Sequence, residues 1–394
     1  MKIKLGVFFG GESVEHEVSI ISAIQAINNI DKEKYDVIPV YITKENKMYV
    51  GENIGNIEAY RDISKLLTKA QQVILIREDN KVKLIRYPMK KFANNEYDYI
   101  DIAFPIVHGT NVEDGALQGY FKTLKIPFVG CDVTASAVGM DKYVMKTVLK
   151  YNDIPVLDGK IYGYYEYEED AKDLMARIEK DIAFPLIVKP VNLGSSVGIK
   201  IAKNKKELEE ALEYAFTFAK KILVERAVMN LREINCSVLG DFEKAVASEC
   251  EEPVGSDEIL SYEDKYISNG NKSGSKGMSS LKRKLPADLT KEMKKQIQDL
   301  AIKTFKVLGC NGVSRIDFII EDNEKIYVNE INTIPGSLSF YLWNATNVEY
   351  KELLNRMIDL ALKRAREEKD ISYTFETNIL SGIKLDGIKG TKGK

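Results

Sequence analysis

The chain has 394 residues, of which 44% are hydrophobic and 29% are charged, a composition typical of a globular protein with two or three packed units. Lysine and arginine total 57 and aspartate and glutamate 59, so the net charge of −2 gives no electrostatic reason to expect nucleic acid as a partner. No apolar run approaches the roughly 20 residues that span a membrane, and residues 1–10 do not resemble a secretory signal, so we expect no membrane partner.

The cysteine and histidine content indicates the compartment and the kind of metal site. The cysteines at positions 131, 236, 250 and 310 are widely spaced and form no C-x-x-C pair, so we expect reduced thiols in a cytoplasmic protein. The chain has only two histidines, His16 and His108, which excludes a histidine-rich zinc site. A metal site would therefore need oxygen ligands, which suit Mg²⁺.

Strand and helix signals alternate in the first third of the chain. A strand over Ile3–Phe9 runs into Gly10-Gly11, a helix with apolar residues at near-helical spacing ends at Asn28-Asn29, and YDVIPVYIT is the next strand. The run YDYIDIAFPIVHG predicts one buried strand that ends at His108-Gly109. This alternation predicts a parallel, doubly wound sheet whose ligand lies at the carboxyl ends of the strands, where both glycine turns belong.

The segment from Thr43 to Lys91 is less regular and is interpreted as an insertion on this first domain. It contains a helix candidate near Ile63–Ala70 and two short strands, QVILI and KVKLI. From Met140 the pattern changes, because a helix in MDKYVMKTVLKYN precedes PLIVKP, a glycine-serine loop and GIKIAK. Two strands joined by a short loop predict an antiparallel hairpin. A charged helix over Lys205–Lys220 and the strand ILVERAV follow.

The last part of the chain combines paired strands with helices. REINCSVLG and KAVASEC are predicted to pair, and the polar loop from Glu252 to Lys282 is long enough to be either a functional lid or disordered. A helix in KEMKKQIQDLAIKTFKVLG, the strands VSRIDFII and KIYVNEINT, and a helix over Tyr350–Arg366 complete it. Residues 382–394, rich in glycine and lysine, are expected to be a frayed tail.

Polar residues interrupt two of these apolar strands. Asp317 lies within SRIDFII, and Glu330 and Asn332 lie two apart in KIYVNEINT, so they point to one face. If the strands are neighbours, three oxygen ligands converge for Mg²⁺, and Glu330 could bridge two ions beside a transferring γ-phosphate. Arg315 shares the face of Asp317 and could stabilise developing negative charge. The alternative is an edge strand with solvated polar residues.

The stretch PLIVKPVNLGSSVGIK has the composition of a phosphate-binding loop. Lys189 ends a strand, and residues 194–198 offer glycines, backbone N–H groups and two hydroxyls. No Gly-Lys-Ser/Thr opens a helix here, so the stretch is not a Walker A motif. The alternative is an ordinary flexible hairpin.

A third cluster, HGTNVEDGALQG, places Glu113 and Asp114 near His108, just past a buried strand. In the structural interpretation, Asp114 caps the helix that starts in GALQGYF and His108 packs under it. That role is compatible with positioning a substrate.

Six motifs occur in a fixed order along the chain: GGESVEHEVS, HGTNVEDGALQG, MDK, KPVNLGSSVG, SRIDF and NEINTIPG. Together they resemble the D-alanine–D-alanine ligases of the ATP-grasp superfamily, over most of the chain from Lys4 to Leu362. The resemblance implies that the carboxylate of a first D-alanine attacks the γ-phosphate of ATP to give an acyl phosphate. The amine of a second D-alanine then displaces phosphate, which yields D-alanyl-D-alanine for peptidoglycan precursors.

The resemblance also implies an α/β (α+β) ATP-grasp fold. We expect a Rossmann-like, parallel-sheet domain over residues 1–135 with an insertion at about 43–91. A small central antiparallel-sheet subdomain would cover 136–227, a larger α+β subdomain 228–375 and a flexible tail 376–394. A homodimer is implied by the resemblance only.

Carried over motif by motif, the resemblance implies a nucleotide site and a metal site. ATP would be bound by Lys142, Lys189, the loop at Ser195-Ser196, the hinge from Glu225 to Val228, the ribose ligand Glu233, and Asn329. Two Mg²⁺ ions, with Mn²⁺ possible, would be held by Asp317, Glu330 and Asn332. Arg315 and the backbone N–H of Gly336 would form the oxyanion site.

The resemblance further implies how the two amino acids are bound. Glu15 would pair with the ammonium of the first D-alanine, and Ser195 and Tyr266 would link to it in a hydrogen-bond chain. Lys265 would face the carboxylate of the second substrate. Relatives that make D-alanyl-D-lactate lack this tyrosine and use a nearby histidine. Because the chain has no histidine beyond His108, an amine nucleophile is favoured.

The chain departs from the family pattern at two positions. Val112 stands where the family usually has glycine, and a β-branched residue resists positive φ. Tyr341 falls where a serine usually binds the carboxylate of the second substrate, although Leu342 still matches, and Ser339 or the Tyr341 hydroxyl could substitute for that serine. The alternatives are therefore an ATP-dependent carboxylate–amine ligase with a different acceptor, or a nucleotide-binding protein without catalysis, which would not need the full set of charged residues.

Overall fold

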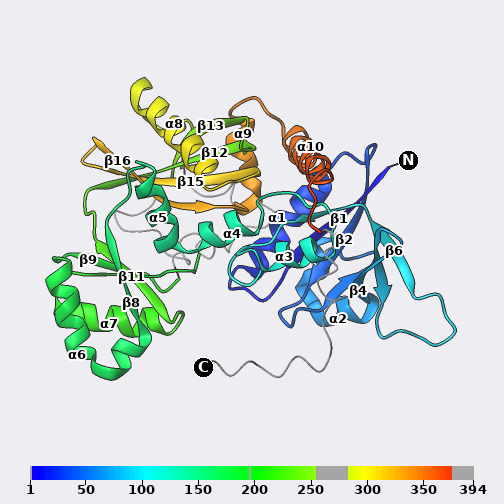
Figure 1. The fold of residues 1–394 in the computed structure, drawn as a ribbon, viewed down its shortest axis with the longest axis horizontal. Coiled ribbons are helices and arrows are strands. Elements are labelled where there is room, and N and C mark those ends of the chain that lie inside the picture. Colours follow the sequence, from blue (N-terminus) through cyan, green and yellow to red (C-terminus); the bar gives the residue numbers. More distant parts are fainter. Residues whose placement is uncertain (1, 195–196, 254–282, 375–394) are drawn as a thin grey trace, which may run out of the picture.

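The structure, a computed structural model, describes residues 2–194, 197–253 and 283–374. Within these ranges the strands form three sheets of seven, four and five strands. In Figure 1 the seven-stranded sheet lies on the right. The five-stranded sheet lies at the upper left, and the four-stranded sheet lies below it. The predicted loop over 254–282 and the predicted tail lie outside the described residues.

The N-terminal sheet has the order β6-β5-β4-β3-β2-β1-β7. Its strands are β1 (Ile3–Gly10), β2 (Tyr35–Ile42), β3 (Met48–Val50), β4 (Gln71–Glu78), β5 (Lys81–Arg86), β6 (Glu96–Ile100) and β7 (Ile102–Pro105). β1 pairs in parallel with β2 and β7, and the pairs from β2 to β6 are antiparallel. The predicted parallel sheet is confirmed around β1, and the predicted insertion extends the same sheet with antiparallel strands.

The single buried strand predicted for YDYIDIAFPIVHG is wrong. The segment forms two strands, β6 and β7, separated by Asp101, and the second ends at Pro105 rather than at His108-Gly109. β6 pairs with β5 and β7 pairs with β1, while the Asp101 N–H donates to the Lys4 carbonyl. The chain therefore passes from one edge of the sheet to the other, and the sheet curls on itself.

Helices and one 3₁₀ turn connect the strands of this sheet or follow it in the chain. They are α1 (His16–Asn29), the 3₁₀ turn η1 (Ile57–Asp62), α2 (Ile63–Lys69), α3 (Ala116–Thr123) and α4 (Val133–Met140). α1 buries an apolar face that includes Ile20, Ile24 and Ile27, as its spacing predicted. Between β1 and α1, the N–H of Gly10 donates to Ser19 Oγ at 2.8 Å, which fixes the turn at the ligand edge of the sheet.

The four-stranded sheet has the order β10-β9-β11-β8. Its strands are β8 (Gly159–Gly163), β9 (Leu186–Pro190), β10 (Lys200–Ala202) and β11 (Lys221–Arg226), and its helices are α5 (Lys142–Tyr151), α6 (Tyr164–Asp181) and α7 (Lys205–Phe216). The predicted antiparallel hairpin of β9 and β10 is confirmed. α7 ends four residues earlier than predicted because the chain must turn before β11 begins.

The five-stranded sheet has the order β14-β13-β12-β15-β16 and is antiparallel throughout. Its strands are β12 (Leu231–Gly240), β13 (Ala245–Pro253), β14 (Arg283–Lys284), β15 (Gly312–Glu321) and β16 (Lys325–Asn332). The remaining elements are α8 (Lys291–Val307), η4 (Gly336–Ser339), α9 (Phe340–Asn344) and α10 (Tyr350–Glu368). The predicted pairing of REINCSVLG with KAVASEC is confirmed.

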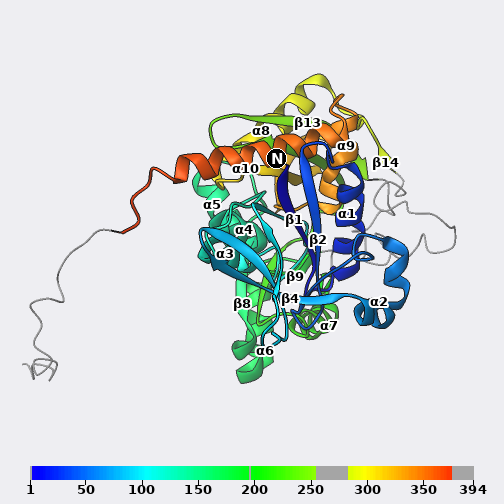
Figure 2. The same cartoon turned by 90° about the vertical axis from the view of Figure 1, so that its right-hand side faces the viewer.

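The last helix, α10, packs against the first strand of the N-terminal sheet. Leu353, Leu354 and Met357 of α10 belong to the same buried cluster as Leu5 and Phe8 of β1. Figure 2 shows α10 lying across the tops of β1 and α1. In the described part of the chain, no helix is both long and apolar enough to cross a membrane. All four cysteines are free and buried.

Candidate active site

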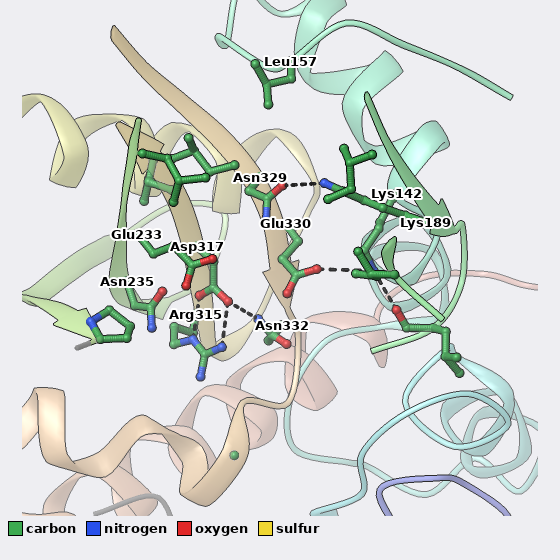
Figure 3. A pocket seen from close by; sticks show the side chains of 18 of the residues that line it. Lys142, Leu157, Lys189, Glu233, Asn235, Arg315, Asp317, Asn329, Glu330 and Asn332 are labelled. Atoms are coloured by element: carbon green, nitrogen blue, oxygen red, sulfur yellow. Dashed lines mark hydrogen bonds and ion pairs between the residues drawn. The ribbon is translucent and has the colours of Figure 1, made fainter. Parts of the chain in front are cut away.

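One cavity is lined by residues of the four- and five-stranded sheets, of α5, and of the loops and helix beside the N-terminal sheet. They include Glu15 from the turn before α1, Lys142 of α5, Lys189 of β9, Glu233 of β12, Arg315 and Asp317 of β15, and Glu330 of β16. Figure 3 shows the labelled side chains of β12, β15 and β16 facing the two lysines across this cavity. The structure therefore brings together residues that are up to 315 positions apart in the sequence.

The two polar strands predicted to be neighbours are neighbours. Asp317 lies opposite Glu330, and Arg315 lies opposite Asn332. Arg315 donates to both carboxylate oxygens of Asp317, at 2.6 and 2.7 Å, and Asn332 Nδ2 donates to Asp317 at 3.1 Å. β16 is the edge strand of its sheet, as the alternative interpretation proposed, but the Glu330 side chain is only 23% exposed because it faces the cavity.

A β-bulge adds a fourth polar side chain to this face. Asp317 pairs with Glu330 but the next residue, Phe318, pairs with Val328, so Asn329 has no opposite residue. The Asn329 amide oxygen then accepts a hydrogen bond from Lys189 Nζ at 3.3 Å (Figure 3). Simple alternation would have pointed Asn329 away from Glu330.

Two lysines close the opposite wall. Lys142 begins α5 because Asp141 caps the helix through the N–H groups of Tyr143 and Val144. The Lys142 ammonium donates to the Leu193 carbonyl at 2.8 Å and lies 3.3 Å from Glu330. Lys189 is the last residue but one of β9, which ends at Pro190, one residue later than the sequence predicted, because Pro190 still lies opposite Ile222 of β11.

Lys189 belongs to a buried trio with Glu225 and Lys146. Both lysines donate to the Glu225 carboxylate, Lys189 at 2.8 Å, and Glu225 has no exposed surface. Burial alone would raise the pKa of Glu225, but the two ammonium groups hold it below its usual value. Burial lowers the pKa of Lys146 to about 8 against the attraction of Glu225.

Lys146 was missed in the sequence analysis. It lies one helical turn after Lys142 on α5, between the buried residues Met145 and Leu149. A lysine on the apolar face of an amphipathic helix is the signal that could have identified it, because such a charge needs a buried partner.

One wall of the cavity is apolar. Leu157, Ile187, Ile199, Ile201, Val228 and Leu231 line it. The Glu225 side chain is occupied by the lysines and the Ala227 N–H donates to the Pro185 carbonyl at 2.9 Å, so an adenine ring would meet other backbone groups of the predicted hinge. Glu233 projects into the cavity close to Asp317 (Figure 3).

Glu15 lies at the other end of the cavity, at the N-cap position of α1, and is 8% exposed. A Cβ atom on Gly194 would lie 2.8 Å from its carboxylate, and one on Gly109 would lie 3.1 Å away. Two glycine turns from different domains therefore approach Glu15 closely, which only glycine permits. The neighbouring predicted residues Ser195, Ser196, Lys265 and Tyr266 lie outside the described residues.

His108 and Glu113 tie the N-terminal domain to the loop after β16. His108 hydrogen-bonds the Ile334 carbonyl at 2.8 Å, and burial lowers its pKa to about 4, so the ring is neutral. Glu113 accepts from the N–H groups of Gly109 and Ile334, at 3.0 and 2.9 Å. Burial, followed by the charge of Glu15, raises the pKa of Glu113 to about 8.

The prediction that Asp114 caps the helix in GALQGYF and that His108 packs under it is partly right. Asp114 accepts from the N–H of Ala116, the first residue of α3, as a cap would. His108 contacts the loop after β16 instead of packing under α3. Val112 does not occupy the positive φ that was expected to strain it. Asn111 takes φ of 69° instead, and Val112 is buried.

The loop after β16 contains a left-handed turn. Ser337, Leu338 and Ser339 have φ of 50°, 52° and 51°, and they follow Gly336, which lines the cavity. The Ser337 N–H donates to Ser22 Oγ of α1 at 2.9 Å, and Leu338 is buried in the N-terminal core. The turn delivers Tyr341 on α9 to the five-stranded sheet, where its hydroxyl donates to Glu251 at 2.7 Å.

Two family models match this chain. The model described as "D-ala D-ala ligase N-terminus" matches residues 4–131, and "D-ala D-ala ligase C-terminus" matches residues 148–359. The chain is 39% identical over 379 residues to the D-alanine–D-alanine ligase of Thermosipho melanesiensis, covering 96% of this chain and 98% of the relative. It is 41% identical over 384 residues to that of Caldicellulosiruptor bescii, covering 95% and 99%.

Solved structures give the same picture. The D-alanine-D-alanine ligase from Coxiella burnetii is similar with a TM-score of 0.76 and 31% identity, covering 93% of this chain and 96% of that one. The VanG D-Ala:D-Ser ligase from Enterococcus faecalis has a TM-score of 0.75 and 32% identity, covering 92% and 100%. The Bacillus anthracis D-alanine–D-alanine ligase complexed with ATP has a TM-score of 0.63 and 26% identity, covering 93% and 99%.

Proposed function

Because the chain belongs to the D-alanine–D-alanine ligase family and is therefore an ADP-forming ligase, we propose that it uses the described cavity to join two D-alanines with ATP. The observation that carries the proposal is the meeting of two lysines, an oxygen-ligand row and Glu15 in one cavity. Each of these groups would bind one charged component of the reaction: the phosphates, the metal ions or the ammonium group of the first D-alanine.

The nucleotide phosphates would bind between α5 and β9. Lys142 and Lys189 present ammonium groups to the cavity, and a phosphate chain can replace their present contacts with Glu330 and Asn329. The apolar wall beside Val228 suits the adenine ring, and Glu233 suits the ribose hydroxyls. Ser195 and Ser196 complete the phosphate loop in this proposal.

The row of Asp317, Glu330 and Asn332 fits Mg²⁺, with Mn²⁺ as an alternative ion. Asn332 donates its Nδ2 to Asp317, so its amide oxygen is the atom that a cation would use. Among the described residues, no group of three or more His, Cys, Asp or Glu side chains could hold a metal alone. That matches an ion completed by substrate phosphates. When bound, two such ions would neutralise charge on the β- and γ-phosphates.

The amino-acid chemistry would occur between Glu15 and Arg315. Glu15 holds the ammonium of the first D-alanine, whose carboxylate oxygen attacks the γ-phosphorus and releases ADP. The amine of the second D-alanine then attacks the acyl carbon, and phosphate leaves. Arg315, fixed by its two hydrogen bonds to Asp317, and the Gly336 N–H would stabilise the oxyanion of the tetrahedral intermediate.

The decisive experiment measures ADP release by purified protein against a panel of amino acids. We expect release that requires both D-alanine and Mg²⁺. If D-alanine gives no ADP above background while another amino acid or dipeptide does, the alternative ligase with a different acceptor replaces this proposal. Tyr341 in place of the family serine is the observation that favours that alternative. If no compound in the panel gives ADP release above background, nucleotide binding without catalysis becomes the favoured function.

The cellular setting is part of the same proposal. We place the protein in the cytoplasm, where ATP and D-alanine are available for peptidoglycan precursors and where its four buried thiols would stay reduced. A homodimer, and the division into domains over 1–135, 136–227 and 228–375, are proposed from the resemblance alone.

A further inference from the structure

A second arginine–carboxylate pair lines the cavity, and the reaction described above does not use it. Glu251 of β13 is 3% exposed and accepts from the Asn235 amide at 3.0 Å and from the Tyr341 hydroxyl at 2.7 Å. The same carboxylate pairs with Arg283 of β14 at 2.9 Å. Three donors therefore converge on one buried carboxylate.

Glu251 lies in register with the row of proposed metal ligands. Glu251 is opposite Asn235, Asn235 is opposite Asp317, and Asp317 is opposite Glu330, across four adjacent strands. Figure 3 shows Asn235 beside Arg315, on the side of the cavity away from Lys142. Glu251 and Asp317 are two strand spacings apart, roughly 10 Å. Asn235 stands between them, so the second pair faces the cavity on the far side of Asn235 from the proposed metal ligands.

Tyr341 is unsuited to the role of the serine it replaces. A phenol has one proton to donate, and here that proton goes to Glu251. The ring lies behind the guanidinium of Arg283, whose central carbon is 4.0 Å from the ring centroid. Arg283 and Glu251 line the cavity, whereas Tyr341 is not among its lining residues.

Arg283 has the chemistry that Tyr341 lacks. A guanidinium carries five N–H donors in a planar fork that matches a carboxylate. The Arg283 side chain is 12% exposed and is held from one side by Glu251 and from another by the Tyr341 ring. Its orientation toward the cavity is therefore fixed before a substrate arrives, which strengthens binding by lowering the cost of ordering.

We propose that Arg283 binds the carboxylate of the acceptor amino acid, with Glu251 and Tyr341 as positioning residues that hold its guanidinium at the cavity wall. The proposal rests on the proposed function and deepens it, because it identifies the acceptor as an α-amino acid with a free carboxylate. The acceptor amine would then point toward the acyl phosphate beside Arg315.

The test uses D-alaninamide, which has no carboxylate to phosphorylate and can serve only as acceptor. Full-length protein receives ATP, Mg²⁺ and equal concentrations of D-alanine and D-alaninamide, and mass spectrometry gives the ratio of dipeptide to dipeptide amide. We expect wild-type protein to favour the dipeptide by about 10- to 100-fold, the range for a charge-assisted contact. In Arg283→Met the ratio should fall to within about threefold of unity.

Two further variants and one control separate binding from folding. Arg283→Lys keeps the charge without the fork and should give an intermediate ratio. Tyr341→Phe keeps the ring and removes the hydroxyl, so the ratio should fall by a few fold. Arg232→Met is the control, because Arg232 makes a similar pair with Glu252 in the same sheet and is not among the cavity-lining residues. Its ratio should equal that of wild type.

The outcomes distinguish the two proposals. A folded Arg283→Met that still prefers D-alanine as strongly as wild type overturns the carboxylate role of Arg283. If that variant does not fold, an unchanged ratio in both Arg283→Lys and Tyr341→Phe has the same consequence. If wild-type protein forms no dipeptide from D-alanine at all, the proposed function fails instead.

Discussion

The two ends of the cavity balance their charges differently. At the nucleotide end, three lysines (Lys142, Lys146 and Lys189) face two carboxylates, Glu225 and Glu330. At the acceptor end, each arginine has its own carboxylate, Arg315 with Asp317 and Arg283 with Glu251. Lysines that share carboxylates suit a polyanionic nucleotide, because a phosphate chain can replace part of their contacts, whereas arginines that are each fixed by one carboxylate suit a small zwitterionic amino acid. The difference supports the proposed assignment of the two ends.

The largest effect should come from the residues where the two ends meet. Asp317→Asn or Glu330→Gln should lower kcat by at least about 1,000-fold, because each removes a carboxylate that would hold the ions at the reacting phosphate. Steady-state ADP release measures this, with Glu324→Gln, on the exposed turn before β16, as the control. Near-normal turnover in either variant would refute the metal assignment.

The stability of the fold should depend more on the buried trio of Lys146, Lys189 and Glu225 than on exposed ion pairs. Glu225→Gln leaves Lys146 and Lys189 buried without their carboxylate and should lower the free energy of unfolding by about 3–5 kcal/mol. Lys146→Met leaves a balanced pair and should cost less. Urea denaturation measures both. Asp158→Asn is the control, since Asp158 is 80% exposed in its pair with Lys150 and should matter by less than about 1 kcal/mol.

The amino-acid end should respond selectively to the loss of Glu15. Glu15→Gln should raise the KM for the first D-alanine by about 10- to 100-fold, the scale of a buried charge-assisted contact, and leave the KM for ATP within about twofold. Glu17→Gln, two residues later on the same helix and 59% exposed in its pair with Lys44, should change neither constant. Equal weakening of both substrates in Glu15→Gln would mean that the ends are not separate sites.

The last prediction concerns the pH dependence of stability. The folded protein raises the pKa of Glu113 from 4.5 to about 8, so Glu113 keeps a proton that the unfolded chain releases. Its stabilising contribution is fully present below pH 4.5 and is lost as pH rises through about 8, by on the order of 1 kcal/mol per pH unit between these values. Thermal melting of Glu113→Gln should show a weaker decline over that window than wild type. Parallel curves would contradict the buried proton.

Part of the candidate site could be predicted from local sequence patterns, and part could not. Strand alternation correctly placed Asp317, Glu330 and Asn332 on one face, because a period of two is a local property. The facing of Asn329 depends on a bulge, and the need for Lys146 depends on Glu225, which is 79 residues away. Local patterns contain neither piece of information.

The same limit explains the missed strand break in the N-terminal domain and the unexpected role of Tyr341. The break at Asp101 follows from curvature of the whole sheet, since β6 and β7 serve opposite edges. Tyr341 looked like the loss of a substrate ligand, but its partner Glu251 is 90 residues away and orients an arginine that no motif contains. The substitution can be understood only together with residues that the fold brings to it.

The left-handed turn over Ser337–Ser339 makes the oxyanion position depend on assembly. Three consecutive non-glycine residues at positive φ cost roughly 1–2 kcal/mol each, so this turn would not persist in an isolated C-terminal fragment. Ser22 accepts from the N–H of Ser337 in the turn, and His108 and Glu113 hydrogen-bond Ile334 just before it; all three come from the first 113 residues. The N-terminal domain thus acts as a template for the loop of the proposed oxyanion site, which follows more than 200 residues later in the sequence.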